Sequence, residues 1–102
     1  MNKLAGKALN LKKLSGYRKN SVVSKEIVKS INGSVTLFAF DKGEGLSEHT
    51  SPYDALVYIA EGRAEIRISG KLHRLQEGEL IIMPKDKPHA LNAAEAFKMM
   101  LV

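Results

Sequence analysis

Short runs of alternating apolar and polar residues recur along most of the chain. The clearest run covers residues 63–70, where Ala64, Ile66 and Ile68 take one side and the charged residues between them take the other. A period of two residues is that of a strand with one buried face, whereas a helix would repeat every 3.6 residues. This pattern predicts β-structure.

Further runs rich in β-branched and aromatic residues predict more strands. Those expected strands are 21–29, 34–40, 54–62, 71–78, 79–84 and 96–102. Asn32-Gly33 is a tight-turn signal between the first two of them, and Glu61-Gly62 is expected to end the run that starts at residue 54. Many short strands with frequent turns and no long helix favour an all-β sandwich or barrel, which we expect to occupy residues 21–102.

Residues 1–20 carry a different pattern and predict a separate N-terminal arm. Apolar residues recur there at spacings of three and four from Leu4 to Leu14, which indicates one or two helical turns or no ordered structure. Residues 1–29 hold eight lysines and arginines against Glu26 alone. We expect either a solvated basic arm or a strand that leans on the barrel or on a partner subunit. Deleting residues 1–20 would leave the melting curve nearly unchanged if the arm is solvated, and would lower it if the arm packs.

The composition of the chain excludes several classes of function. The 102 residues suffice for one domain, and the absence of cysteine excludes disulfides and a thiolate nucleophile. The sequence has no apolar run near the roughly 20 residues that span a bilayer, and no recognised nucleic-acid motif. We therefore expect a cytoplasmic protein without a membrane or nucleic-acid partner.

Two histidine-containing stretches resemble the paired motifs of small single-domain cupins. In the first, Gly43 is followed by five residues and His49, and the stretch ends at Gly62. In the second, five residues separate Gly78 from Pro84, and His89 follows, although Asp86 stands where the family motif usually has glycine. This resemblance spans roughly residues 34–102 and implies a cupin-type double-stranded β-helix, or jelly-roll barrel.

The resemblance also implies a metal site, and here the chain departs from it. Metal-binding cupins use three histidines and one glutamate; of those positions His49 and His89 are kept, while Ser51 and Ala55 replace the other His and the Glu of the first motif. Asp54 is the nearest alternative ligand, and two histidines with one carboxylate suit non-haem iron. A bound Fe, Mn, Ni or Zn ion is therefore one of two alternatives.

The other alternative is a pocket without metal. By strand alternation Ser51 and Tyr53 should point inward with His49, and the second motif should add His89. Such a pocket would bind a small polar or acidic molecule, since imidazole both donates and accepts hydrogen bonds. Whether the chain is an enzyme stays open: it is predicted to be a binding protein, or else a dioxygenase-like or isomerase-like metal-dependent cupin.

Association with a second copy is also predicted. Tyr58 is out of phase with its inward-facing neighbours Val57 and Ile59, so it should lie on the outside of its sheet. An apolar outer surface favours a homodimer.

Overall fold

The computed structural model describes residues 2–102, and strands dominate it. The strands are β1 (Val22–Ser30), β2 (Gly33–Phe40), β3 (Gly45–His49), β4 (Ala55–Ile68), β5 (Lys71–Gln76), β6 (Leu80–Met83), β7 (His89–Asn92) and β8 (Phe97–Leu101). One short 3-10 turn, η1 (Leu11–Lys13), lies in the N-terminal arm. No helix within residues 2–102 has the length and apolar character needed to cross a membrane.

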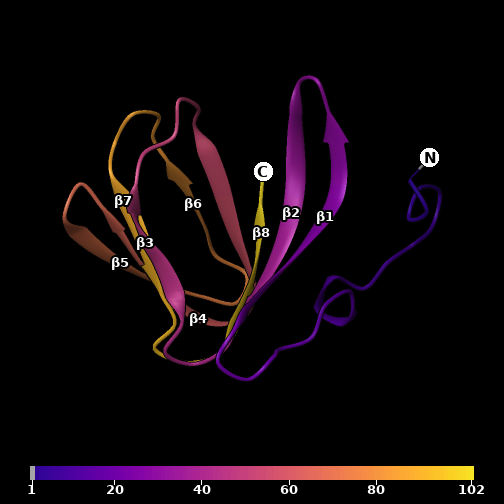
Figure 1. The fold of residues 1–102 in the computed structure, drawn as a ribbon, viewed down its shortest axis with the longest axis horizontal. Coiled ribbons are helices and arrows are strands. Elements are labelled where there is room, and N and C mark those ends of the chain that lie inside the picture. Colours follow the sequence, from indigo (N-terminus) through magenta and orange to yellow (C-terminus); the bar gives the residue numbers. More distant parts are fainter. Residues whose placement is uncertain (1) are drawn as a thin grey trace.

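All strand pairs are antiparallel, and they form two sheets that share β4 (Figure 1). Sheet A contains β1, β2, β8, the first half of β4, and β6. Sheet B contains β3, β7, the second half of β4, and β5. The predicted all-β, cupin-type barrel is confirmed, because the two sheets curl around one apolar interior.

The expected break at Glu61-Gly62 is wrong, because one 14-residue strand runs through it. Gly62 has a φ of 78°, and the register of β4 against β8 shifts between Ile59 and Glu61. A left-handed glycine next to a bulge bends a strand without ending it. β4 therefore passes from sheet A into sheet B at the point where the strand was expected to end.

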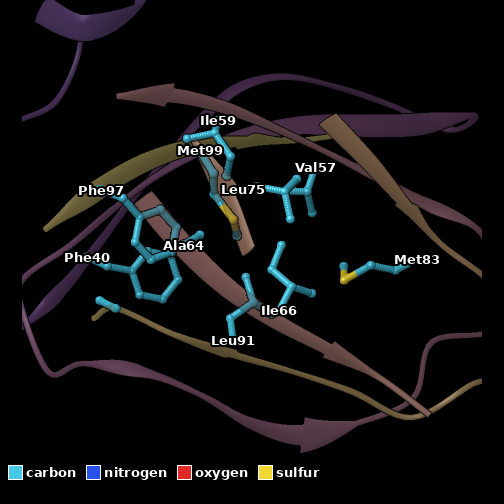
Figure 2. Packing of buried hydrophobic residues seen from close by; sticks show 11 residues of the cluster. Phe40, Val57, Ile59, Ala64, Ile66, Leu75, Met83, Leu91, Phe97 and Met99 are labelled. Atoms are coloured by element: carbon cyan, nitrogen blue, oxygen red, sulfur yellow. The ribbon is translucent and has the colours of Figure 1, made fainter. Parts of the chain in front are cut away.

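The inner faces of both sheets supply the core (Figure 2). The rings of Phe40 on β2 and Phe97 on β8 stack with centroids 4.5 Å apart and an interplanar angle of 9°. Val57 and Ile59 extend this layer along β4, and Ile66 continues it in sheet B, all three fully buried. Strand alternation thus directs one apolar face of each sheet into a common interior.

The N-terminal arm lies against the outside of sheet A, beside the β1–β2 hairpin (Figure 1). Lys98 on β8 is only 7% exposed, and its ammonium group donates a 2.6 Å hydrogen bond to the carbonyl oxygen of Lys12. That ammonium also lies 5.0 Å from the ring centroid of Tyr17 and 3.8 Å from Glu61. The Tyr17 hydroxyl donates a 2.5 Å hydrogen bond to Glu61, so the arm is tied to the barrel by three linked groups.

These contacts decide between the two expected outcomes of deleting the arm. Without residues 2–18, Lys98 loses the Lys12 carbonyl and the Tyr17 ring, and the apolar surface around it becomes exposed. We expect the free energy of unfolding to fall by about 2 kcal/mol. Urea denaturation of full-length and truncated chains measures this, and identical curves would restore the solvated-arm interpretation.

Candidate functional site

The two motif histidines meet on the inner face of sheet B. His49 ends β3 and lies opposite His89, the first residue of β7, which in turn lies opposite Ile68 on β4. The two Nε2 atoms are 3.0 Å apart, and the rings meet edge to face with centroids 4.3 Å apart. His89 is 2% exposed, whereas His49 is exposed to solvent. The pair therefore has one buried and one accessible member.

The contacts of the other ring nitrogen, Nδ1, indicate which nitrogen of each imidazole carries the proton. His49 Nδ1 lies 2.7 Å from the carbonyl oxygen of Ser47, and His89 Nδ1 lies 3.2 Å from that of Lys87. A carbonyl oxygen only accepts, so each Nδ1 must be the protonated nitrogen. In the neutral state both Nε2 atoms then present lone pairs to each other. Two lone pairs that face each other across 3.0 Å repel, so this arrangement favours a ligand that donates a hydrogen bond to one of them or a cation that both can bind.

The burial of His89 leads to a pH dependence of stability. Burial lowers the pKa of His89 below its ordinary value of 6.5, and repulsion from His49 lowers it further. As the pH falls through 6.5, His89 therefore binds a proton in the unfolded chain, whereas in the folded chain it stays neutral to a lower pH. The stability that neutral His89 contributes is fully present above pH 6.5 and is lost as the pH falls toward the folded pKa.

We expect the free energy of unfolding of the wild type to decrease as the pH is lowered from neutral, and the decrease to be smaller in His89→Gln. Urea titrations across this pH range measure both slopes. His73→Gln is the matched control, since His73 lies on β5 opposite Ile66 and outside the pair. A wild-type slope in His89→Gln would contradict the assignment.

The other predicted pocket residues do not join the histidine pair. Ser51, Tyr53 and Asp54 line a separate surface cavity of about 620 Å³ beside the β1–β2 turn. The Asp54 carboxylate accepts a hydrogen bond of 2.8 Å from the backbone N–H of Lys85, and the Tyr53 side chain is 75% exposed. Alternation failed here because β3 ends at His49 and no strand resumes before β4.

The loop that precedes His89 explains one departure from the second motif. Asp86 stands where cupins usually have glycine, and its φ is 63°. Aspartate tolerates this left-handed conformation better than most residues do. Its backbone N–H donates to the carbonyl of Ser51 at 2.8 Å, so the loop keeps its turn without the glycine.

The residues around the pair fit a metal ion only in part. Both Nε2 atoms face one point while both Nδ1 atoms hydrogen-bond to carbonyls, which is how metal-binding histidines are usually held. However, no three His, Cys, Asp or Glu side chains gather into a metal-binding group within residues 2–102. Protein sites for catalytic metals usually supply at least three ligands. The set is incomplete, and Asp54 does not complete it.

A double-sheeted antiparallel barrel with two motif histidines on an inner face is the arrangement of a small cupin domain. Residues 36–102 match the family model described as "Cupin domain". Because this match covers more than half of the chain, the protein belongs to the cupin family.

Individual proteins are similar to this chain over most of its length. A conserved protein of unknown function from Streptococcus pyogenes is 39% identical, with a TM-score of 0.92 over 99% of this chain and 89% of that one. A cupin superfamily protein from Desulfitobacterium hafniense is 30% identical, with a TM-score of 0.91 over 99% and 93% of the two chains. Polyketide synthase CurC from Streptomyces cyaneus is 27% identical over 87% of this chain, which spans 62% of that relative's length.

Proposed function

We propose that this chain is a small-molecule-binding cupin in which His49 and His89 hold a small polar or acidic ligand. The observation that carries the proposal is the approach of the two Nε2 atoms to 3.0 Å. Both Nδ1 atoms are already engaged with backbone carbonyls, so each ring has only its Nε2 left for a ligand. Two hydrogen-bond acceptors that face the same point favour a ligand that can donate a proton to them.

The chemistry of the pair suits a hydroxyl or carboxylic acid group. A hydroxyl can donate to one Nε2, while a carboxylic acid can transfer its proton to an imidazole and remain as a charge-assisted partner. Access is expected from the side of His49, because His89 is buried against the barrel interior. The apolar neighbour Ile68, opposite His89, would contact the rest of the ligand.

The test uses acetate and benzoate as acidic probes and glycerol as a neutral polyol. We expect a saturable change in the imidazole nitrogen signals of His49 and His89 in protein labelled with ¹⁵N-histidine, and no change for His73. His49→Ala should abolish the change with little loss of stability, since His49 is exposed. Binding that leaves both imidazoles unchanged, or no binding at millimolar probe, would contradict the proposal.

A second candidate is a metal-dependent cupin enzyme, of dioxygenase or isomerase type. It is favoured by the common orientation of the two Nε2 atoms toward one point. Fe, Mn, Ni or Zn bound by His49 and His89 would supply Lewis-acid or oxygen chemistry. The remaining ligands would have to come from a substrate or solvent.

Elemental analysis separates the two candidates. Protein purified without a histidine tag should contain less than stoichiometric Fe, Mn, Ni and Zn if it is a binding protein. Near-stoichiometric metal that disappears in a His49→Ala/His89→Ala double variant would establish the metal-dependent alternative.

A further inference from the structure

We propose that a cavity on the outer side of sheet B binds a small zwitterion, a molecule with both an ammonium and a carboxylate group, such as an amino acid. The cavity has a volume of about 530 Å³, and its charged and polar lining side chains are Arg63, Glu65, Arg74, Gln76, Glu79 and Glu95. Those on β4 and β5 point outward, because Ala64 and Leu75, which alternate with them, are buried in the core. The cavity is therefore separate from the histidine pair, which faces the interior.

The cavity forms where β4 changes its neighbouring strands. β8 pairs with β4 as far as Gly62, and β7 pairs with it only from Glu65 onward. Residues 63–64 of β4 therefore have no strand beside them on this side within residues 2–102. Residues 93–96 connect β7 to β8 across the gap, and β5 borders the other side of β4. The bend in β4 thus produces a hollow between a loop and a strand.

Hydrogen bonds hold both borders of the cavity in place. In the loop between β7 and β8, the Ala93 N–H donates to the carbonyl oxygen of Glu44 at 2.8 Å, and the Ala93 carbonyl accepts from the Gly43 N–H at 2.7 Å. Beyond the end of β5, the Glu79 carboxylate accepts a hydrogen bond of 2.8 Å from the Gln76 N–H. Binding at this cavity would therefore have to order little of the chain, which favours affinity for a small ligand.

Two of the charged side chains in the cavity already pair with each other. The Glu65 carboxylate accepts a hydrogen bond of 3.2 Å from the Asn92 amide and one of 3.3 Å from Arg74 Nε. These hydrogen bonds, that of Asn92 most of all, lower the pKa of Glu65, so it is charged at neutral pH. Glu65 and Arg74 therefore largely satisfy each other and form part of the cavity lining.

Arg63 and Glu95 line the same cavity but are not paired in this way. Neither forms an ion pair within residues 2–102, and both side chains are exposed. Arg63 lies on β4 at the bend, and Glu95 lies on the loop beside it. One guanidinium and one carboxylate are thus available to a ligand that brings the opposite charge to each.

The charges of the cavity favour a ligand with groups of both signs. Three carboxylates line it against two guanidiniums, so a simple anion would meet an excess of negative charge. A simple cation could pair with Glu95 but would leave Arg63 without a partner. A zwitterion can place its carboxylate on the planar fork of Arg63 and its ammonium group on Glu95. The volume of about 530 Å³ lies within the roughly 300–1,000 Å³ that is typical of small-molecule sites.

The first test measures the binding of three probes to the full-length chain by ¹H–¹⁵N NMR. The probes are 6-aminohexanoate, which carries both charges, and hexanoate and hexylamine, which carry one each. We expect 6-aminohexanoate to shift the backbone amide signals of residues 63–65 and 94–95 with a dissociation constant of about 1 mM. Hexanoate and hexylamine should shift them about 10-fold more weakly, because each leaves one ion pair unmade. Equal affinity of either singly charged probe, or no saturable shift, overturns the proposal.

The second test removes each of the two unpaired charges. Arg63→Gln and Glu95→Gln should each weaken the binding of 6-aminohexanoate by about 10-fold. Arg67→Gln is the matched control for Arg63, because Arg67 is exposed further along β4 and does not line the cavity. Glu48→Gln, at an exposed position on β3, is the control for Glu95. All four side chains are exposed, so melting curves should stay unchanged. Wild-type affinity in either cavity variant, or an equal loss in the controls, overturns the proposal.

The His49→Ala variant separates this cavity from the histidine site. The probe 6-aminohexanoate has a carboxylate, so it can also enter the histidine site if the proposed function is correct. In His49→Ala we expect the amide signals of the cavity to respond with wild-type affinity. A cavity response that disappears in His49→Ala overturns this proposal and leaves the proposed function intact. A cavity response without any change at the imidazoles supports this proposal and counts against the proposed function alone.

Discussion

Replacing Gly62 with alanine is expected to lower the free energy of unfolding by about 3 kcal/mol or more. Gly62 has a φ of 78°, which alanine adopts at a cost. In addition, a Cβ at this position would overlap the carbonyl oxygen of Ala96 and lie 2.9 Å from the Cα of Phe97. Backbone atoms of β8 and of the loop before it cannot move aside without disturbing sheet A. Urea denaturation at neutral pH measures the loss.

Gly70→Ala separates backbone strain from steric overlap. Gly70 has nearly the same φ, 82°, but no atom lies within 4 Å of the position that a Cβ would take. Its substitution should cost only about 1 kcal/mol, which is the conformational term alone. Equal losses at the two glycines would show that the close approach of β4 and β8 at Gly62 does not matter.

The second large effect is expected at Phe97, where truncation to alanine should cost about 3–5 kcal/mol. Phe97 is fully buried, and its ring stacks on that of Phe40 at the centre of the core (Figure 2). Removing the ring loses apolar burial and leaves a cavity that the rigid strands cannot close. Thermal or urea unfolding checks the size of the loss.

A double-mutant cycle with Phe40→Ala tests the stacking itself. The coupling energy between the two rings should be about 0.5–1.5 kcal/mol, because each single truncation already breaks their contact. Phe38 provides a comparison for this coupling energy, because its ring centroid lies 6.0 Å from that of Phe40 and its side chain is only partly buried. Strictly additive losses for Phe40 and Phe97 would contradict the packing described.

The sequence predicted the strands well because alternation is a local property. Ala64, Ile66 and Ile68 were expected on one side, and the first two are buried with the third packed against them. Gly62 was harder to interpret, because the same residue type serves a hairpin turn and a bend inside a strand. The two cases are distinguished only by strand pairing, because β4 pairs with β6 and β8 up to Gly62 and with β5 and β7 after it.

The site and the arm depended on contacts that the sequence does not display. Motif spacing was enough to bring His49 and His89 together, but Ser51 and Tyr53 were placed by extending alternation past the end of β3. The role of Lys98 could not be predicted from the sequence, since its hydrogen bond to Lys12 spans 86 residues. Glu61 likewise gains its partners, Tyr17 and Lys98, only after the arm docks.

The most direct test of the histidine pair is heteronuclear NMR on protein labelled with ¹⁵N-histidine, at a pH where the imidazoles are neutral. The structure predicts the Nδ1–H tautomer for both His49 and His89, and nuclear Overhauser contacts between their ring protons. An Nε2–H tautomer in both rings, together with no contact between them, would show that the two imidazoles do not form this pair.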